Sequence, residues 1–422
     1  MRPHATLIIA GHAPQEAKET LMPSPFDFPT PSIRRWAQPV MFGLLMSAAA
    51  SALAQAPAPP TSAMQTCQLG NMTLESGAVI PNFRMTYITH GTLNPERSNA
   101  ILSIHGLRGD RTTQSVWAGP GLALDTTRYF VVQPDTMSVA SIDPNATTSP
   151  TRSGMNMEFP RFNIRDMVTA EHRLLTECLN IRRLVAVTGT SMGGIGALQW
   201  AVSFPDFMDA VIPLVPQAHA SRQANFIWEA ARQTIMLDPK WRDGSYPNDD
   251  PPRRGTGVGM IIQNAFGISA SGYDSLFPNG AAVHRNYAQM VEQIGRTTQA
   301  RDWIYRTWAI ESHDIAQTPP FNGDLAAAAR SIRARLLLIP NCFDQLLPPG
   351  ESGVMQVAAH APNVKVVDID DPGGHGGTRS PRGIAVITAE TRDLFARIAD
   401  GRPGFGGPAF PRHWARADRC PG

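Results

Sequence analysis

A Gly-x-Ser-x-Gly pentapeptide with Ser191 at its centre is the most restrictive feature of this 422-residue chain. It follows four largely apolar β-forming residues at 185–188, and a helix-compatible segment begins directly after it. The order strand, pentapeptide, helix is that of a nucleophile elbow, a strained turn that exposes a serine hydroxyl. Gly189 and Gly193 allow the strand and the helix to approach closely around the turn. The sequence therefore predicts an α/β fold with the Ser191 hydroxyl at the carboxyl edge of its sheet.

The acid and the base that a serine nucleophile needs are found later in the chain. In folds with this elbow the acid comes first and the histidine second, each just past a strand. Residues 334–340 have the pattern of a buried parallel strand and lead to Asp344, the candidate acid. Residues 364–369 have the pattern of a further strand, and the glycine-rich loop after it carries His375, the candidate base. A predicted helix over about 383–398 closes the domain.

An earlier turn provides candidates for the oxyanion hole. The apolar strand predicted at 99–104 is followed by His105, Gly106 and Leu107. A turn of this kind usually supplies one backbone N–H, here that of Leu107, and the residue after the nucleophile, Met192, supplies the other. Both donors belong to the main chain, so their placement matters more than their side chains. We expect His105 to brace this loop rather than to act as the base.

Short motifs between about residues 85 and 400 form a specific combination. Two motifs lead into and form a predicted strand, at residues 121–126 and 129–132, and two precede the elbow, at 159–160 and 164–168. Three surround the predicted nucleophile, at 191–194, 197–201 and 204–206, and three open the segment after it, at 232–235, 238–241 and 244–246. In this combination the chain resembles the homoserine O-acetyltransferase family of α/β-hydrolases. The resemblance implies the α/β-hydrolase fold, with a mostly parallel central sheet flanked by helices. It also implies a helical lid over residues 219–325, inserted within a domain over 55–422, that forms a tunnel to the serine. Such a lid often mediates dimerisation, so a homodimer through the lid is compatible with the sequence.

The resemblance also bears on the substrate. Arg232 and Tyr246 match positions that contact substrate in the family, and they are the candidate substrate-binding residues. Family members carry a glycine-rich segment after the fourth strand, whereas residues 133–150 contain no glycine here. They also place an aspartate directly after the catalytic histidine, where it helps to hold the amino group of homoserine, whereas this chain has Gly376. An anionic substrate group remains compatible with the sequence, but recognition of an amino acid is not expected.

Residues 1–54 have the pattern of a leader with a secretory signal peptide rather than of a folded domain. A basic pair at 34–35 precedes an apolar stretch at 40–50, and Ala-Leu-Ala at 52–54 forms a small-x-small cleavage site. The apolar stretch is too short to span a membrane. The basic pair lies unusually far from the first residue, so Met22 is an alternative start. The sequence predicts a periplasmic or secreted protein without a stable membrane anchor.

The cysteines are consistent with export. All four lie in the predicted mature part, which allows two disulfides in an oxidising compartment. Cys67 and Cys420, near the two ends, are natural partners. A bridge from Cys342 could brace the loop of the candidate acid, two residues further on. The alternative is that the cysteines are buried thiols.

Composition argues against several other classes of protein. The formal net charge is only +2, and no basic run is interleaved with aromatic residues, so a nucleic-acid partner is not expected. No group of His, Cys and Asp residues has metal-ligand spacing, and we expect neither a metal nor another cofactor. Without the leader, the length suits one domain with a large insertion.

These patterns predict an exported serine hydrolase that cleaves a carboxylic ester, a lactone or a related small acyl compound. Ser191 would attack the acyl carbon, His375 would take its proton and Asp344 would hold the imidazole. Because acetyl-CoA is a cytoplasmic metabolite, water is the expected acyl acceptor of an exported enzyme. One alternative is an O-acyltransferase of the homoserine O-acetyltransferase type that uses another donor. A second is a secreted binding protein on an inactive hydrolase scaffold, which the intact triad positions disfavour.

Overall fold

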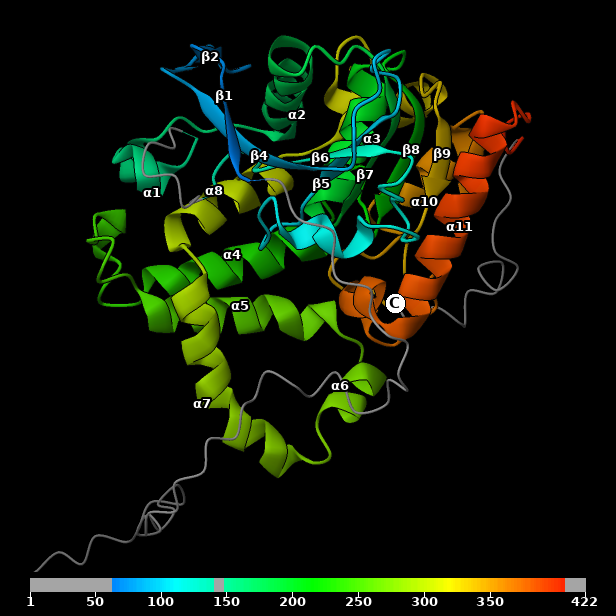
Figure 1. Cartoon of the computed structure of the whole chain (residues 1–422). Coiled ribbons are helices and arrows are strands. Elements are labelled where there is room, and N and C mark those ends of the chain that lie inside the picture. The colour runs from blue at the N-terminus through cyan, green and yellow to red at the C-terminus, as the bar shows by residue number, and fades with distance from the viewer. Residues whose placement is uncertain (1–62, 140–147, 407–422) are drawn as a thin grey trace, which may run out of the picture. The chain divides into compact units, whose positions relative to one another are not determined.

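The computed structural model describes residues 63–139 and 148–406; the predicted leader and Cys420 lie outside the described residues. An eight-stranded sheet runs in the order β1-β4-β6-β5-β7-β8-β9-β10 (Figure 1). Its strands are β1 (Gln65–Gln68), β4 (Arg84–His90), β5 (Ala100–Ile104), β6 (Phe130–Pro134), β7 (Leu184–Thr190), β8 (Met208–Leu214), β9 (Arg335–Leu338) and β10 (Val364–Val366). Separately, β2 (Met72–Thr73) pairs with β3 (Val79–Ile80).

The sheet is mostly parallel, as the sequence predicted. The neighbours from β6 through β5, β7, β8 and β9 to β10 all pair in parallel. At one edge β4 pairs antiparallel with both β1 and β6. Parallel strands end at a common edge, so the loops after β5, β7, β9 and β10 meet there. These four strands correspond to the four runs from which the candidate site residues were inferred.

Alternating side chains of the strands contribute to two apolar cores. On β5, Leu102 and Ile104 belong to one core and Ile101 to the other, and β9 alternates in the same way. The first core also contains side chains of α2 (Ile164–Arg173), α3 (Met192–Ser203), α9 (Leu325–Arg330) and α10 (Val354–His360), and the second contains those of α11 (Pro381–Ala399). Helices therefore cover both faces, as expected for parallel strands that are apolar on both sides.

Two helices outside the insertion, α2 and α11, have recognisable start signals. Asn163 and Asp166 form a capping box at the start of α2, and Ser380 caps α11 ahead of a proline. The predicted helix at 383–398 corresponds to α11. The α-helices are α1 (Pro150–Ser153), α2 (Ile164–Arg173), α3 (Met192–Ser203), α9 (Leu325–Arg330), α10 (Val354–His360) and α11 (Pro381–Ala399). Shorter turns are η1 (Thr113–Trp117), η2 (Asn156–Glu158), η3 (Leu174–Cys178), η5 (Ile315–Gln317) and η6 (Gly374–Arg379).

Between β8 and β9 the chain leaves the sheet and forms a helical segment, which we call the lid (residues 219–325). It contains α4 (Arg222–Met236), η4 (Arg242–Gly244), α5 (Arg253–Gly267), α6 (Ala270–Leu276), α7 (Gly280–Thr297) and α8 (Ala300–Glu311). Helix α5 packs between α4 and α7 (Figure 1). It also contacts η6, the turn that carries His375. The lid is thereby connected directly to the loops at the carboxyl edge of the sheet.

One cysteine expectation is corrected by the structure. Cys67 on β1 forms a disulfide with Cys178 at the end of η3, so the expected pairing of Cys67 with Cys420 is wrong. The two partners are 111 residues apart, and only the packing of β1 beside η3 brings them together. Cys342 is a buried thiol that the structure does not bridge to Cys178. Among the described helices, none has the length and apolar character needed to cross a bilayer.

Candidate active site

Ser191 is placed by a sharp turn between β7 and α3. Its backbone has a φ of 60° and a ψ of −120°, a strained combination for a residue with a side chain. The Ser191 amide donates to the carbonyl oxygen of Leu214 at 2.9 Å and anchors the turn to β8. Ser191 is the N-cap of α3, yet its hydroxyl makes no capping bond. The hydroxyl is therefore left for another partner.

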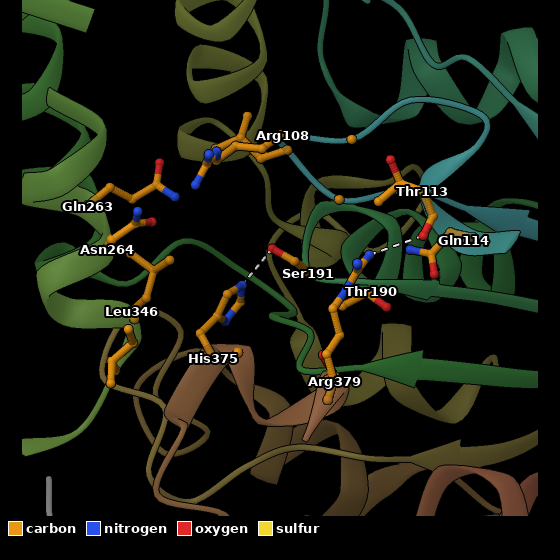
Figure 2. A pocket seen from close by; sticks show the side chains of 17 residues that line it. Arg108, Thr113, Gln114, Thr190, Ser191, Gln263, Asn264, Leu346, His375 and Arg379 are labelled. Carbon is orange, nitrogen blue, oxygen red and sulfur yellow. Dashed lines mark hydrogen bonds between the residues drawn. The ribbon is translucent and has the colours of Figure 1, made fainter. Parts of the chain in front are cut away.

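That partner is His375. Ser191 Oγ lies 2.8 Å from His375 Nε2, and His375 Nδ1 lies 2.6 Å from Asp344 Oδ2. Figure 2 marks the Ser191–His375 hydrogen bond with a dashed line. An ionised carboxylate only accepts hydrogen bonds, so Nδ1 carries the imidazole proton. Nε2 then accepts the hydrogen bond of the serine hydroxyl. The structure thus joins the three residues that the sequence predicted as nucleophile, base and acid.

The orientation of Asp344 is set by its own loop. The residue is 2% exposed, and its Oδ1 accepts from the amides of Leu346 and Leu347 at 2.9 and 3.0 Å. Because these bonds occupy one oxygen, the other is directed at His375. Two backbone donors also offset the cost of burying the carboxylate.

Asn341 connects the loop of the acid to the loop of the histidine. This fully buried side chain donates from Nδ2 to the carbonyl oxygens of Asp371 and Gly374, at 2.8 and 2.6 Å. Its Oδ1 accepts from the Asp371 amide at 3.2 Å. Sequence reasoning missed this residue, although its place just after β9 was a usable signal.

The two predicted oxyanion donors lie beside the serine. A Cβ built on Gly106 would be 3.5 Å from the Ser191 Cβ, which shows how close the loop after β5 comes to the nucleophile. Leu107 lines the same cavity as Ser191. Met192 is the first residue of α3, where an amide has no acceptor within its own helix.

His105 braces this loop. The Thr136 amide donates to His105 Nε2 at 3.1 Å, so that nitrogen carries no proton. Nδ1 is then the donor to the Gly106 carbonyl oxygen, 2.8 Å away. Burial lowers the pKa of His105 and keeps the ring neutral. The imidazole therefore joins the loop after β5 to the segment after β6, which is the bracing role that we expected.

The lid also holds the loop after β5 (residues 105–110), which we call the oxyanion loop. Arg306 on α8 donates to the carbonyl oxygens of Gly109 and Asp302, at 3.4 and 3.3 Å. Burial lowers the pKa of Arg306 to about 10, so the guanidinium is still charged at neutral pH. The buried Asp302 carboxylate accepts from the hydroxyls of Ser149 and Thr151. A charged lid residue thus fixes the loop that supplies Leu107.

Ser191 and His375 line a cavity of about 470 Å³. Its walls come from the oxyanion loop, η1, the lid helix α5 and η6. Arg108 and Arg379 face this cavity, and burial lowers the pKa of both guanidinium groups. No carboxylate is among the described residues that line it. The other polar side chains of the wall are Thr113, Gln114, Thr190, Gln263, Asn264 and Thr378.

Arg232 and Tyr246, the predicted substrate-binding residues, do not line this cavity. Arg232 is 2% exposed and pairs with Glu229 and Glu311 at 2.6 and 2.5 Å. Tyr246 is also 2% exposed, with its ring under the Arg301 guanidinium and its hydroxyl accepting from the Arg301 amide at 3.2 Å. Both side chains have protein partners within the lid and lie outside the wall of this cavity, so their contact with substrate stays a prediction.

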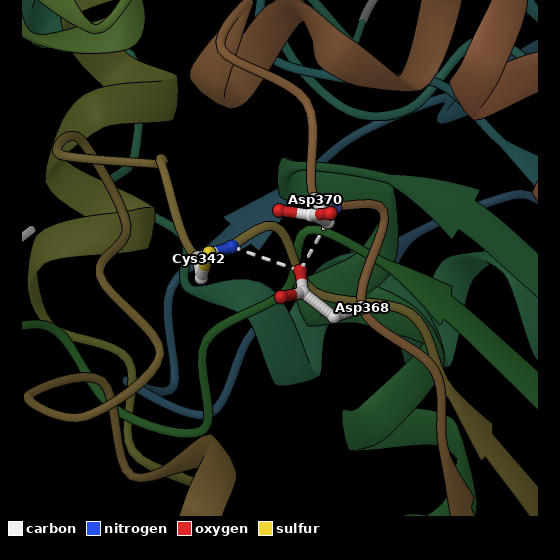
Figure 3. Close-up of side chains that lie close together, drawn as sticks. All are labelled: Cys342, Asp368 and Asp370. Carbon is white, nitrogen blue, oxygen red and sulfur yellow. Dashed lines mark hydrogen bonds between the residues drawn. The ribbon is translucent and has the colours of Figure 1, made fainter. Parts of the chain in front are cut away.

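Cys342, Asp368 and Asp370 form a second cluster of polar side chains (Figure 3). Their potential ligand atoms lie within 4.8 Å of one another. Asp368 Oδ1, however, accepts from the backbone amides of Cys342 and Asp370, at 3.0 and 3.1 Å. These bonds account for the arrangement as a brace between the loops after β9 and β10, and we assign no metal to it.

Comparison with known proteins agrees with the fold. Residues 99–375 match the family model described as alpha/beta hydrolase fold. This match spans more than half of the chain, from β5 to His375. The chain therefore belongs to the α/β-hydrolase family.

Within this family the chain is related to homoserine O-acetyltransferase, as the motifs predicted. The homoserine O-acetyltransferase of Zymomonas mobilis is 32% identical over 341 residues, which cover 72% of this chain and 90% of that protein. The crystal structure of homoserine O-acetyltransferase from Bacillus anthracis superposes with a TM-score of 0.70 at 25% identity, over 80% of this chain and 98% of that one. An acetylester hydrolase from Corynebacterium glutamicum has the same fold, with a TM-score of 0.71 at 24% identity over 79% and 96% of the two chains.

The cavity contains residues that sequence reasoning missed. Arg108 lies in the predicted oxyanion loop, so its position was a signal that could have identified it. Gln263 and Asn264 carried no such signal, because only the packing of α5 brings them to Ser191. Arg379 follows His375 by four residues and was equally overlooked.

Proposed function

We propose that this α/β-hydrolase is a serine hydrolase that cleaves a small carboxylic ester, a lactone or a related acyl compound. The hydrogen-bonded series of Ser191, His375 and Asp344 in the wall of a cavity is the observation that carries the proposal. The Ser191 backbone is strained, and its hydroxyl makes no capping bond. The His375 imidazole has the required tautomer, and the Asp344 carboxylate is oriented towards it. This combination is what nucleophilic acyl chemistry requires.

The reaction proceeds through an acyl-enzyme. Ser191 Oγ attacks the acyl carbon while its proton passes to His375 Nε2. The bond to the leaving alcohol then breaks, and His375 returns the proton to the leaving oxygen. Water, losing a proton to His375, attacks the acyl-enzyme; the carboxylic acid leaves and Ser191 Oγ regains the proton. Asp344 stays ionised throughout and stabilises the imidazolium.

The oxyanion of each tetrahedral intermediate is assigned to the backbone amides of Leu107 and Met192. Donors of this kind stabilise charge that develops only in the transition state. The bracing of the loop by His105 and Arg306 supports the assignment, since preorganised donors need no reorganisation during the reaction.

The cavity favours a substrate without a positively charged group. Gly376 follows His375 and supplies no side chain to pair with an ammonium group. The described lining contains two guanidinium groups and no carboxylate. An ammonium group buried there would be unpaired, which is costly. These features support hydrolysis of an ester over acylation of an amino acid.

Acyl transfer is the second candidate function. It is favoured by the similarity to homoserine O-acetyltransferases, which extends over most of the chain. The two reactions share the first half and differ in whether water or an alcohol takes the acyl group. Product analysis with an acyl ester, in the presence and absence of homoserine or a simple alcohol, separates them.

Export is part of the proposal. A disulfide between Cys67 and Cys178 is consistent with an oxidising compartment, where such bonds persist. Expression of the full chain with its own leader, followed by N-terminal sequencing of the periplasmic or secreted product, tests it. The expected result is cleavage after Ala54; an uncut chain in the cytoplasm contradicts export.

A fluorophosphonate probe tests the nucleophile. We expect the probe to label the protein at Ser191 and Ser191→Ala to abolish both labelling and hydrolysis of p-nitrophenyl acetate, with a loss of several orders of magnitude in rate. Ser153→Ala, at the end of α1, is a matched control that should retain labelling. Labelling that persists in Ser191→Ala contradicts the proposal.

A further inference from the structure

Arg108 is a positively charged side chain with no partner in the cavity of the nucleophile. Among the described residues, its guanidinium makes no hydrogen bond and no ion pair, although it borders the space in front of Ser191. Arg379, the other guanidinium of the cavity, is held differently, because it donates to the Thr113 carbonyl oxygen at 3.1 Å. Arg108 is thus the cation of this site that remains available to a ligand.

Gln263 provides a second and independent observation. Its side chain is 6% exposed, and its amide makes no hydrogen bond among the described residues: Oε1 is buried and can only accept, whereas the NH₂ group can donate to an anion. Buried amides normally have hydrogen-bond partners, so an orphaned one needs an explanation. Figure 2 shows the Arg108 guanidinium reaching towards the Gln263 amide, with Asn264 beside it. Two polar groups without protein partners therefore face each other above Ser191.

The space between these groups and His375 is open. Gly376 follows His375, and no atom of a residue beyond its two chain neighbours lies within 4 Å of where its Cβ would be. The absence of a side chain leaves room for a substituent of the substrate beside the reacting carbonyl group. The only formal charges on the described wall are the positive charges of the arginines and, when protonated, of His375.

We propose that Arg108, assisted by the NH₂ group of the Gln263 amide, binds a carboxylate group of the substrate, so that the preferred substrates are esters that carry one negative charge. The inference rests on the proposed serine hydrolase function and specifies its substrate class. A guanidinium matches a carboxylate with two parallel hydrogen bonds, and such charge-assisted bonds are about twice as strong as neutral ones. The carboxylate belongs either to the acyl part or to the alcohol part of the ester, and each source has its own test.

The test compares two matched pairs of esters. In the first pair, mono-4-nitrophenyl adipate carries the carboxylate in the acyl part, and 4-nitrophenyl hexanoate is its neutral counterpart. In the second pair, 4-acetoxybutanoate carries the carboxylate in the alcohol part, and 4-acetoxybutanamide is its neutral counterpart. For one of these pairs we expect the kcat/KM of the wild-type protein to be about tenfold higher, or more, for the anionic ester. Raising the ionic strength should reduce this ratio, because salt screens the attraction.

Arg108→Gln should reduce the same ratio by about tenfold, mainly through a higher KM for the anionic ester, because the lost interaction is present before the chemical step. The control is Arg254→Gln, which removes an exposed arginine at the other end of α5 and should leave the ratio unchanged. Arg108→Lys keeps the positive charge but loses the two parallel N–H donors of the guanidinium, and it should give an intermediate ratio. It also provides a result if the glutamine variant does not fold.

The outcomes separate this inference from the function on which it rests. Hydrolysis of the neutral esters without a preference for either anionic ester, or a preference that persists in Arg108→Gln, overturns the role of Arg108 and leaves the serine hydrolase intact. Absence of hydrolysis of all four esters and of fluorophosphonate labelling contradicts the hydrolase function, and the inference with it.

Discussion

A Cβ atom on Gly193 would lie 2.7 Å from the carbonyl carbon of Ile104, which is closer than real Cβ contacts come. Gly193 is in the first turn of α3, and Ile104 ends the strand that leads into the oxyanion loop. The helix behind the nucleophile and the strand before the oxyanion donor are therefore in backbone contact. This contact sets the separation between Ser191 and Leu107.

Gly193→Ala should accordingly damage both stability and activity. The added methyl group meets backbone atoms that cannot rotate away, and overpacking of this kind costs about 1–3 kcal/mol or more. Urea unfolding and fluorophosphonate labelling measure the two effects. Gly196→Ala, three residues along α3, is the matched control, because its Cβ would have an ordinary contact of 3.5 Å. It should be neutral or stabilise by about 0.5–1 kcal/mol. Equal behaviour of the two variants contradicts the interpretation.

Asp344→Asn should lower turnover of p-nitrophenyl acetate by about 10⁴ while the fold is retained. The asparagine oxygen can still accept from the amides of Leu346 and Leu347, so its NH₂ group is directed at His375 Nδ1. The imidazole proton then moves to Nε2, which can no longer accept the serine proton. Steady-state kinetics and circular dichroism check this. Asp371→Asn is the control; near-normal turnover of Asp344→Asn would transfer the acid to Asp371 or Asp314.

The purified mature protein should not acetylate homoserine from acetyl-CoA, yet it should hydrolyse small activated esters. With glycine at position 376, no carboxylate is among the described residues that line the cavity, so the substrate ammonium group would have no partner there. Gly376→Asp should fold, since nothing lies within 4 Å of the new Cβ, and should improve binding of amines without efficient transfer. Acetyl-homoserine is measured with both substrates saturating. Transfer by the wild-type protein that is faster than ester hydrolysis would favour the acyltransferase alternative.

Glu171 should make the fold less stable as the pH rises. Burial raises its pKa to about 8 from 4.5, and its carboxyl accepts from Trp200 Nε1 at 2.7 Å. Between these pH values the unfolded chain binds fewer protons than the folded one, so the free energy of unfolding decreases with pH. Glu171→Gln keeps an acceptor for Trp200 and removes the titration. Urea unfolding at pH 5 and pH 8 should show a smaller loss for this variant than for the wild type; equal losses would rule out the explanation.

The lid should join two copies of the chain. Of the large apolar side chains that are exposed among the described residues, those on the lid are Phe226, Leu237, Phe266, Leu276, Val283 and Tyr287. A second copy packed on the lid would cover these side chains, which are exposed in the single chain. Light scattering should give the mass of a dimer, and the double variant Val283→Asp/Tyr287→Asp should give that of a monomer. Val79→Asp, an exposed position outside the lid, is the control. A wild-type monomer contradicts the proposal.

The sequence by itself determined the parallel sheet, the elbow and the positions of the three triad residues. Each of these depends on a short pattern that is complete within a few neighbouring residues: an apolar run, a glycine spacing, a polar residue just past a strand. Parallel strands end at one edge, so the order of such runs already places Ser191, Asp344 and His375 near one another.

Only the tertiary structure decided which distant segments meet. The Cys67–Cys178 disulfide depends on β1 packing beside η3, and the access of Gln263 to the cavity depends on the docking of α5. Arg232 is a second residue whose partners depend on how distant segments pack. Its motif indicated a substrate ligand, but the approach of α8 gave it Glu311 as a partner inside the lid. The partners of a side chain depend on how separate helices pack, and no local pattern in the sequence encodes that packing.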